Sequence, residues 1–185
     1  MSSHRSPPES LSDAAASSLT AASTPTSTSS SYPSSPVSRI GRDHQRYGSD
    51  GARLVAGTVP FRSVKAGGAE VMLVSSTKTP ASWILPKGGW EDDETEPQAA
   101  MRETYEEAGV VGCITLQLLS CELPGKSGKL TRHTYYGLCV DDVLTEWPES
   151  HRARRWVPIA EAAVLVKHPH HVQAIQALRK ALEAD

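Results

Sequence analysis

Runs of apolar residues, separated by turns rich in glycine and proline, predict a mixed α/β unit that begins near residue 39. The clearest run, residues 71–74 (Val-Met-Leu-Val), is apolar at every position and is typical of a strand covered on both faces. Strand-like apolar patterns also occur at residues 53–59, 83–85, 113–123, 130–140 and 155–157. Residues 124–128 (Pro-Gly-Lys-Ser-Gly) have hairpin-turn chemistry, so the strands on either side of them are expected to pair.

Helical spacing predicts three helices. Thr95 and Gln98 have the Thr-x-x-Gln spacing of a capping box, so a helix is expected from about residue 96 to residue 108, where Gly109 ends it. Two further helices are expected at residues 159–166 and 172–183. Strands of this kind with helices among and after them predict an α/β fold in which a mixed sheet is sandwiched between helices.

Composition separates the N-terminal segment from the rest of the chain. Residues 1–38 are mainly Ser, Thr, Ala and Pro, which cannot bury enough apolar surface to offset chain entropy, so a disordered tail is predicted. A mitochondrial presequence is the alternative for a segment rich in serine. Arg5 is the only arginine before Arg39, and early prolines and acids oppose a basic amphipathic helix. Residues 39–185 are therefore expected to form a single folded domain.

Charge and cysteine content limit the classes of partner. A net charge of −2 gives no basic field, so bulk nucleic-acid binding is not expected. No segment is long and apolar enough to cross a membrane. Three scattered cysteines (Cys113, Cys121 and Cys139) without metal-ligand spacing suggest reduced thiols, and hence a protein of the cytoplasm or nucleus. We expect a monomer that acts on a small molecule.

The candidate chemistry lies on the helix predicted at residues 96–108. Glu103 and Glu107 are four residues apart and share a face, with Glu106 on its edge. Clustered carboxylates repel one another unless a cation lies among them, and hard oxygen ligands suit Mg²⁺ or Mn²⁺. Arg102 is placed to hold Glu94 or Glu106 through a forked ion pair. A solvated acidic face is the alternative interpretation of these residues.

The spacing of the glycines, the arginine and the glutamates within positions 88–110 resembles the Nudix box. Gly88 is followed by Glu94, then by the pairs Arg102-Glu103 and Glu106-Glu107, and Gly109 closes the run. Thr104 is the one departure, since the family usually has an aliphatic residue there. The resemblance implies an α/β/α Nudix fold and a hydrolase that splits a diphosphate linked to another moiety.

Sequence outside this stretch narrows the resemblance to the diphosphoinositol polyphosphate phosphohydrolases of the fungal and plant type. The matching segments are residues 53–57, 73–76, 83–91, 132–136 and 147–156. Together they extend the resemblance over about residues 53–173. Members of that subfamily remove the β-phosphate from diphosphoinositol polyphosphates; many also split diadenosine polyphosphates, and some cleave inorganic polyphosphate.

The resemblance also implies roles for individual residues. Glu103 and Glu107, with a backbone oxygen near Gly88, would hold Mg²⁺. Arg102 belongs to the catalytic set, and either Glu106 or Glu107 would be the general base; the resemblance favours Glu106, whereas spacing alone does not choose. The substrate-binding candidates are Arg53, Ser76, Lys78, Lys87, Gly88, Gly89, Lys129, Arg132, His133, Arg152 and His170.

Some of these assignments are open at the level of sequence. Lys126 is a further candidate cation, and which of Lys129, Arg132 and His133 reaches the ligand is undecided. His170 stands where the subfamily usually has a lysine, so its charge would depend on pH. If residues 152–156 form a strand, Arg152 and Arg154 would face the same side.

Three alternatives differ from this assignment. A dinucleoside polyphosphate or mRNA-cap hydrolase would need aromatic platforms for a base. A non-catalytic Nudix module that senses inositol phosphates would usually have lost a metal-binding glutamate, and none is missing here. The histidines at positions 168, 170 and 171 could bind a transition metal, but no cysteine lies near them and Pro169 is expected to open a helix.

Overall fold

The structure, a computed structural model, describes residues 38–39, 41–65, 68–125 and 128–184, so the predicted disordered tail, apart from Ser38, lies outside the described residues. The elements are β1 (Arg53–Ser63), β2 (Ala69–Ser75), β3 (Trp83–Ile84), β4 (Lys87–Gly89), α1 (Glu96–Ala108), β5 (Val110–Pro124), β6 (Leu130–Val143), β7 (Arg154–Pro158), α2 (Ile159–Leu165) and α3 (Pro169–Ala184). Every helix and strand expected from the sequence is present, most with slightly longer bounds.

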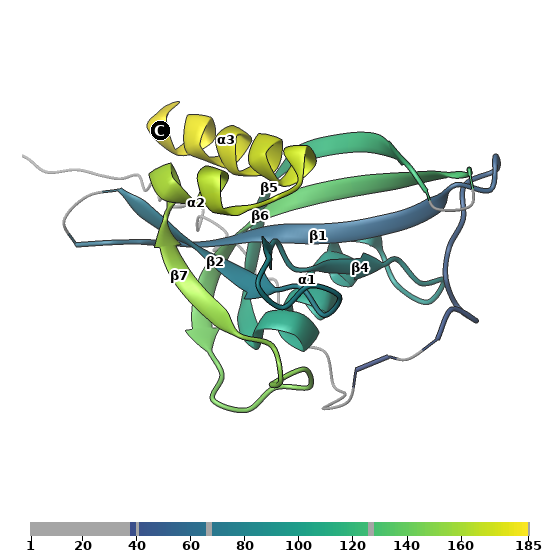
Figure 1. The fold of residues 1–185 in the computed structure, drawn as a ribbon, viewed down its shortest axis with the longest axis horizontal. Coiled ribbons are helices and arrows are strands. Elements are labelled where there is room, and N and C mark those ends of the chain that lie inside the picture. The colour runs from purple at the N-terminus through teal and green to yellow at the C-terminus, as the bar shows by residue number, and fades with distance from the viewer. Residues whose placement is uncertain (1–37, 40, 66–67, 126–127, 185) are drawn as a thin grey trace, which may run out of the picture.

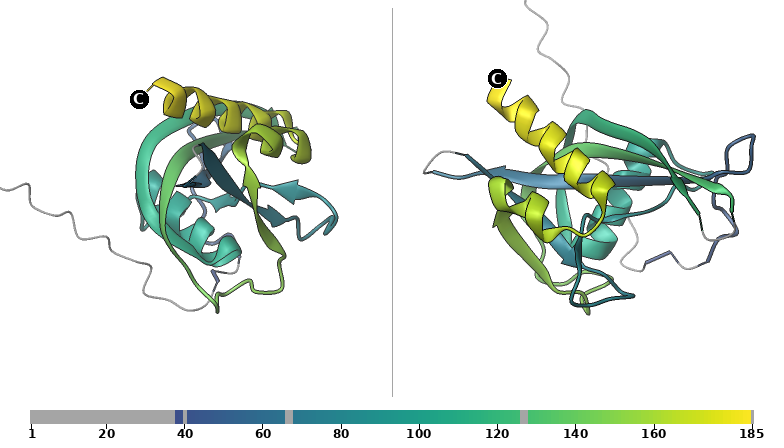
Figure 2. Two further views of the ribbon diagram at one scale, coloured as in Figure 1. Left: turned by 90° about the vertical axis from the view of Figure 1, so that its left-hand side faces the viewer. Right: turned by 45° about the horizontal axis from the view of Figure 1, so that its top comes forward.

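The strands form one mixed sheet. The main path runs β3-β2-β1-β6-β5, while β4 pairs with β1 and β7 pairs with β2. β1 and β6 are parallel, and the other pairs are antiparallel. α2 and α3 cover one face of the sheet and α1 covers the other (Figures 1 and 2). The predicted fold, a mixed sheet between helices, is confirmed.

The continuous apolar run in β2 is explained by helices on both faces. Val71 and Leu73 belong to the cluster that includes Leu178 of α3. Met72 and Val74 point the other way and pack in the cluster that includes Ala108 of α1. Because successive strand residues point to opposite faces, a strand between two helical layers must be apolar at every position.

The first turn and the end of α1 have the predicted chemistry. The Thr95 backbone N–H donates to Gln98 Oε1 at 2.8 Å, and Gly109 ends the helix with φ of 60°, in the left-handed region that favours glycine. Thr104, where the Nudix box usually has an aliphatic residue, is fully buried against the sheet. Its hydroxyl donates to the Ala100 carbonyl at 2.7 Å and lies 2.6 Å from the Thr58 hydroxyl, so both of these buried hydroxyls are paired.

The expectation that Arg152 and Arg154 share a strand face is wrong. β7 begins at Arg154, and Arg152 lies in the bend that precedes it. The Arg154 guanidinium stacks 3.8 Å over the Trp147 ring and donates to the Ala108 carbonyl at 2.6 Å. Arg154 therefore secures the end of α1. Among the described residues, no helix has the length and apolar character needed to span a bilayer.

Candidate functional site

Helix α1 presents its acidic side chains to strand β4. Glu107 is buried, and both of its carboxylate oxygens accept hydrogen bonds. The Lys87 backbone N–H donates to Oε2 at 3.2 Å, and the Arg152 guanidinium donates to Oε1 at 2.8 Å. Pairing between β4 and β1 thus places the Lys87-Gly88-Gly89 backbone directly against the acidic face of the helix.

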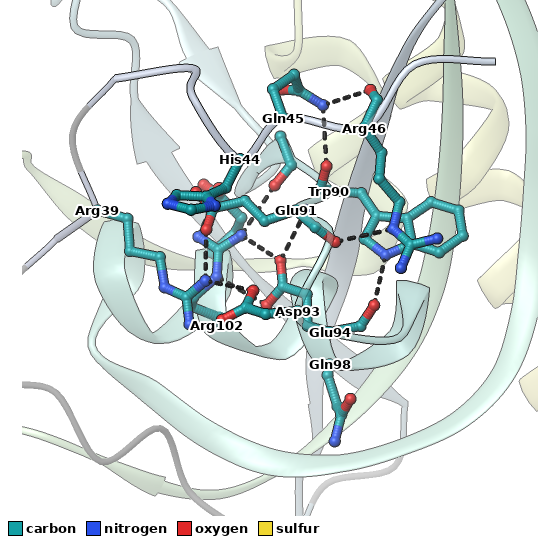
Figure 3. Close-up of polar contacts among 12 residues, drawn as sticks. Arg39, His44, Gln45, Arg46, Trp90, Glu91, Asp93, Glu94, Gln98 and Arg102 are labelled. Atoms are coloured by element: carbon teal, nitrogen blue, oxygen red, sulfur yellow. Dashed lines mark hydrogen bonds and ion pairs between the residues drawn. The ribbon is translucent and has the colours of Figure 1, made fainter.

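Arg102 organises the other acids of this face. Its Nε and Nη2 atoms donate to the two oxygens of Glu94 at 2.9 and 2.6 Å, which is the forked ion pair expected from the sequence. Nη1 lies 2.9 Å from Glu103 and 3.5 Å from Glu106, while Nη2 also donates to the Gly89 carbonyl at 2.8 Å. Figure 3 shows Arg102 beside Glu94. One buried guanidinium therefore fixes the direction of three carboxylates.

The electrostatics of these acids favour a bound cation. Burial raises the pKa of both Glu106 and Glu107 to about 7, and it raises the pKa of Glu103 as well. The neighbouring carboxylate of Glu103 adds to both shifts, and the surrounding arginines and Lys87 offset them only in part. Neighbouring buried carboxylates disfavour one another's ionised forms when no cation is present. A divalent ion bound among them would stabilise those ionised forms.

Close approach at Gly88 explains why a glycine stands there. A Cβ atom built on Gly88 would lie 2.0 Å from Glu103 Oε2, so a side chain would displace the carboxylate. The Glu103 carboxylate therefore packs against the Gly88 backbone, and carboxylate and carbonyl oxygens are the kinds of ligand that Mg²⁺ prefers. No three His, Cys, Asp or Glu side chains of the described residues are arranged to hold a metal ion; Arg102 and Arg152 occupy several of the acceptors instead.

The segment before β1 lies against the loop that follows β4. Arg39 forms ion pairs with Glu91 and Asp93, and Arg46 donates to the carbonyls of Glu91 and Asp92 at 3.0 and 2.8 Å (Figure 3). A backbone hydrogen bond from Arg39 also reaches Glu106, whose pKa it lowers. The start of the described chain is thus part of the wall of the site.

Two adjoining cavities open beside α1. A cavity of about 310 Å³, which we call the acidic cavity, is lined by the carboxylates of the site, by Gly88 and Gly89, and by basic side chains. The acids are Glu91, Glu103 and Glu107, and the bases are Arg39, Arg53 and Lys87. A wider groove of about 770 Å³ continues from it toward the turn between β5 and β6. The residues shared by both are Arg53, Lys87, Thr131 and His133. A compartment that contains both carboxylates and cations therefore leads into a second one whose lining has no carboxylate among the described residues.

The second compartment is lined by basic side chains from separate segments of the chain. Its lysines and arginines are Arg42, Arg53, Lys78, Lys87 and Lys129. The predicted substrate residues that line the groove are Arg53, Lys78, Lys87, Lys129, His133 and His170, and Gly88 and Gly89 line the acidic cavity. Parallel pairing sets Val55 opposite His133, which is how β1 and β6 bring these residues to one end of the sheet.

Three predicted substrate residues lie elsewhere. Arg132 points outward and forms ion pairs with Asp50 and Glu122 at 2.7 Å each. Arg152 is buried, is paired with Glu107 and lines neither cavity. Ser76 also lines neither; its hydroxyl accepts a hydrogen bond from the Thr79 backbone within the loop after β2. Lys126 lies outside the described residues.

The histidines of the groove do not supply charge near neutral pH. Burial lowers the pKa of His133 to about 3 and that of His170 to about 4, with neighbouring histidines and Lys87 adding to both shifts. His171 is fully buried and its Nδ1 accepts a hydrogen bond from the Leu85 backbone at 3.4 Å, so it contributes to the core. The expectation that His170 substitutes for a cationic lysine is not supported by its surroundings.

Sequence reasoning missed the part played by residues 39–47. Arg39, Gly41 and Gln45 line the acidic cavity, while Arg42 and Tyr47 line the groove. These residues precede the first strand, and no apolar periodicity marks their position. The signal available was the concentration of basic residues just before β1, from Arg39 to Arg53.

Comparison with known proteins gives the family. The profile of the NUDIX domain matches residues 52–179. The chain is 42% identical over 145 residues to "Nudix hydrolase 21, chloroplastic" of Arabidopsis thaliana, covering 76% of this chain and 73% of that relative. It is 37% identical over 139 residues to "Diphosphoinositol polyphosphate phosphohydrolase 3-beta" of Bos taurus, covering 72% and 82%.

Comparison with solved structures agrees with the family found from the sequence. The structure superposes on a binary complex of the C. elegans Ap4A hydrolase with a TM-score of 0.58 and 25% identity, over 71% of this chain and 98% of that one. This similarity extends over most of the described chain. The chain belongs to the Nudix family of hydrolases, which act on phosphoanhydride substrates.

Proposed function

We propose that this protein is a Mg²⁺-dependent phosphohydrolase that removes the β-phosphate from diphosphoinositol polyphosphates. The observation that carries the proposal is the groove beside the acidic cavity, where five lysine and arginine side chains converge. An inositol ring with many phosphates has no large apolar face and needs cations on several sides. The name of the 37% identical bovine relative, a diphosphoinositol polyphosphate phosphohydrolase, supports the same substrate class.

Glu103, Glu107 and the backbone oxygen near Gly88 are the proposed Mg²⁺ ligands, with Mn²⁺ as a substitute. Nudix hydrolases generally use a divalent metal of this kind. The fit rests on the raised pKa values of the acids and on the contact between Gly88 and Glu103. When bound, the ion neutralises charge on the attacked phosphoryl group and lowers the pKa of a water molecule.

Glu106 is the proposed general base. Its contact with the Arg102 side chain is long, 3.5 Å, whereas both oxygens of Glu107 are held by closer donors. A pKa of about 7 suits an acid that must both accept and release a proton near neutral pH. Arg102 keeps Glu103 and Glu106 in place, and Arg53 and Lys87, at the junction of the two cavities, are placed to hold the phosphates beside the cleaved bond.

Dinucleoside polyphosphates are the second candidate substrates. The groove also contains apolar and aromatic side chains, namely Tyr47, Leu123, Pro124 and Leu130, and Tyr47 is 50% exposed. An exposed tyrosine ring is a platform on which a base can stack. The structural neighbour from C. elegans is an Ap4A hydrolase.

Phosphate release with saturating Mg²⁺ tests the proposal. A diphosphoinositol polyphosphate, a diadenosine polyphosphate and inorganic polyphosphate would be compared at equal concentration, with products separated by ion-exchange chromatography. The proposal expects the highest kcat/KM for the inositol substrate. Turnover of the dinucleotide alone would support the second candidate, and binding of the inositol substrate without release would indicate a non-catalytic module.

A further inference from the structure

Arg53 occupies the junction of the two cavities without an ionic partner. Its side chain lines both the acidic cavity and the groove. Four other arginines near the site, Arg39, Arg102, Arg132 and Arg152, form ion pairs with carboxylates, whereas Arg42 of the groove forms none among the described residues. Within the described part of the chain, no carboxylate lies within ion-pair distance of Arg53. Its guanidinium is therefore not held in a direct ion pair at the point where a polyphosphate would pass from one cavity to the other.

A neutral side chain orients this arginine. The Arg53 Nε donates to Gln45 Oε1 at 2.7 Å. The amide group of Gln45 is itself fixed, because its Nε2 donates to the carbonyls of Arg46, Leu54 and Trp90 at 2.8, 2.9 and 3.0 Å. Figure 3 shows Gln45 between Arg46 and Trp90. Since all three partners are acceptors, only the amide nitrogen can face them, and the oxygen must face Arg53.

The glycine at position 89 leaves the room for this arrangement. A Cβ atom on Gly89 would lie 2.1 Å from Gln45 Oε1 and 3.0 Å from the Arg53 guanidinium. The pair thus packs directly on the backbone of β4, one residue from Gly88 and its contact with Glu103. Gln45 connects the segment before β1, the loop after β4 and the arginine at the junction.

We propose that Gln45 is a positioning residue, which aims the Arg53 guanidinium at a phosphate of the substrate and leaves its positive charge available. A carboxylate at position 45 would orient the arginine but would also neutralise its charge. An aliphatic side chain would leave the charge but would not orient the guanidinium. The inference rests on the proposed function only in requiring a polyphosphate substrate. It assigns a role in substrate affinity to a residue outside the Nudix box.

A double-mutant cycle with Gln45→Met and Arg53→Ala tests the proposal. Methionine has nearly the shape of glutamine but cannot accept from Arg53. Each single variant is expected to raise KM about tenfold, the effect of losing one charge-assisted contact, with kcat within twofold of wild type. In the Arg53→Ala background, Gln45→Met should add less than a further twofold, because there is no guanidinium left to orient.

The salt dependence of KM provides a second readout. Raising ionic strength should weaken substrate binding less in both single variants than in wild type, because Arg53→Ala removes the positive charge and Gln45→Met leaves it without a fixed direction toward the phosphate. A residue that only stabilised the fold would lower Tm without changing this slope. Arg46→Met is the matched control, because Arg46 anchors the same segment to the loop after β4 without touching Arg53. It should lower Tm but leave KM within twofold.

Two results would overturn the proposal: additive effects of Gln45→Met and Arg53→Ala on KM, or an unchanged KM in Arg53→Ala alone. The second result is decisive even if Gln45→Met does not fold. All variants are compared on whichever polyphosphate wild-type enzyme cleaves fastest. A preference for dinucleotides would therefore contradict the proposed inositol substrate while leaving the role of Gln45 open to the same measurement.

Discussion

Arg152 forms a buried ion pair with Glu107, in which its Nη2 lies 2.8 Å from Oε1 of that carboxylate. The same guanidinium donates to Glu149 Oε2 at 2.5 Å and to the Ser75 carbonyl at 3.0 Å. Sequence resemblance suggests that Arg152 holds a substrate phosphate, yet these contacts direct its donors toward protein acceptors. The geometry favours a role in fixing the metal-binding glutamate.

Arg152→Ala is therefore expected to lower kcat by about tenfold, since a buried charged partner of Glu107 is lost. The loss should be similar for inositol and dinucleotide substrates, with little change in KM. Arg152→Lys should recover only part of it, because an ammonium cannot reproduce the contacts of a planar guanidinium. Steady-state kinetics on both substrates measure this. A rise in KM confined to the inositol substrate would restore the assignment of Arg152 as a phosphate ligand.

Glu107→Gln should reduce turnover by roughly a hundredfold or more, given the size of general-base and metal-ligand contributions. The substitution keeps the shape of the side chain, and its single amide oxygen can still accept from Arg152 or from the Lys87 backbone, though not from both. Circular dichroism should show an unchanged fold. Glu122→Gln, which removes an exposed acid paired with Arg132, is the control and should keep full activity. Near-normal turnover of folded Glu107→Gln would refute the metal assignment.

Stability of the metal-free protein should depend on pH through the buried acids. The pKa values of Glu106 and Glu107 are raised from 4.5 to about 7, so the folded state holds protons that the unfolded state releases. Their stabilising contribution is fully present below pH 4.5 and is lost as pH rises through about 7. Thermal unfolding in a chelator should show Tm falling over this range, and Mg²⁺ should reverse the fall. The Glu106→Gln, Glu107→Gln double variant should lack this part of the pH dependence.

Lys78 and Arg132 form a matched pair of predicted substrate cations. Lys78 lines the groove, whereas Arg132 is already paired with Asp50 and Glu122. Lys78→Ala should raise KM severalfold for the inositol substrate, and Arg132→Ala should leave it unchanged, because surface ion pairs contribute little. Equal effects of the two substitutions would show that general electrostatic attraction, rather than the groove, determines affinity.

Truncations at two positions should distinguish the contribution of residues 1–37 from that of Arg39 at the wall of the site. A chain that begins at Ser38 keeps the contacts of Arg39 with Glu91 and Asp93 and should retain activity within twofold. A chain that begins at Arg42 keeps this arginine of the groove but leaves those two acids unpaired beside the cavity. It should show a KM several times higher, because unpaired acids repel an anionic substrate. Arg39→Ala in the full-length chain should reproduce the effect, and an unchanged KM in both would exclude it.

Sequence was sufficient where local chemistry determines structure. The capping pair Thr95 and Gln98 and the terminal Gly109 are found where spacing placed them. The fork of Arg102 falls on Glu94, one of the two partners that spacing leaves open. The continuous apolar run in β2 likewise predicted a strand covered on both faces. In these cases the neighbours along the chain are also the neighbours in space.

The side-chain directions that the sequence could not predict depend on contacts between segments far apart along the chain. Arg132 and His133 are adjacent, but the strand alternation turns Arg132 outward to Asp50 and His133 inward to the groove. Arg152 matches a phosphate-binding position, yet its direction depends on a bend before β7 that brings it beneath Glu107. Gln45 has no distinguishing pattern at all, because its importance comes from three carbonyls and an arginine that only the fold assembles.

The parallel register of β1 and β6 has a consequence for how the protein folds. Arg53 lies opposite Thr131 and Val55 opposite His133, although 78 residues separate each pair along the chain. The β5–β6 hairpin can form from local contacts, whereas β1 must wait until β6 has been synthesised and its loop entropy has been offset. We therefore expect the junction of Arg53 and His133 to be among the last features to form. A polyphosphate bound there would report completed folding, and it would stabilise the native chain against unfolding from its N-terminal strand.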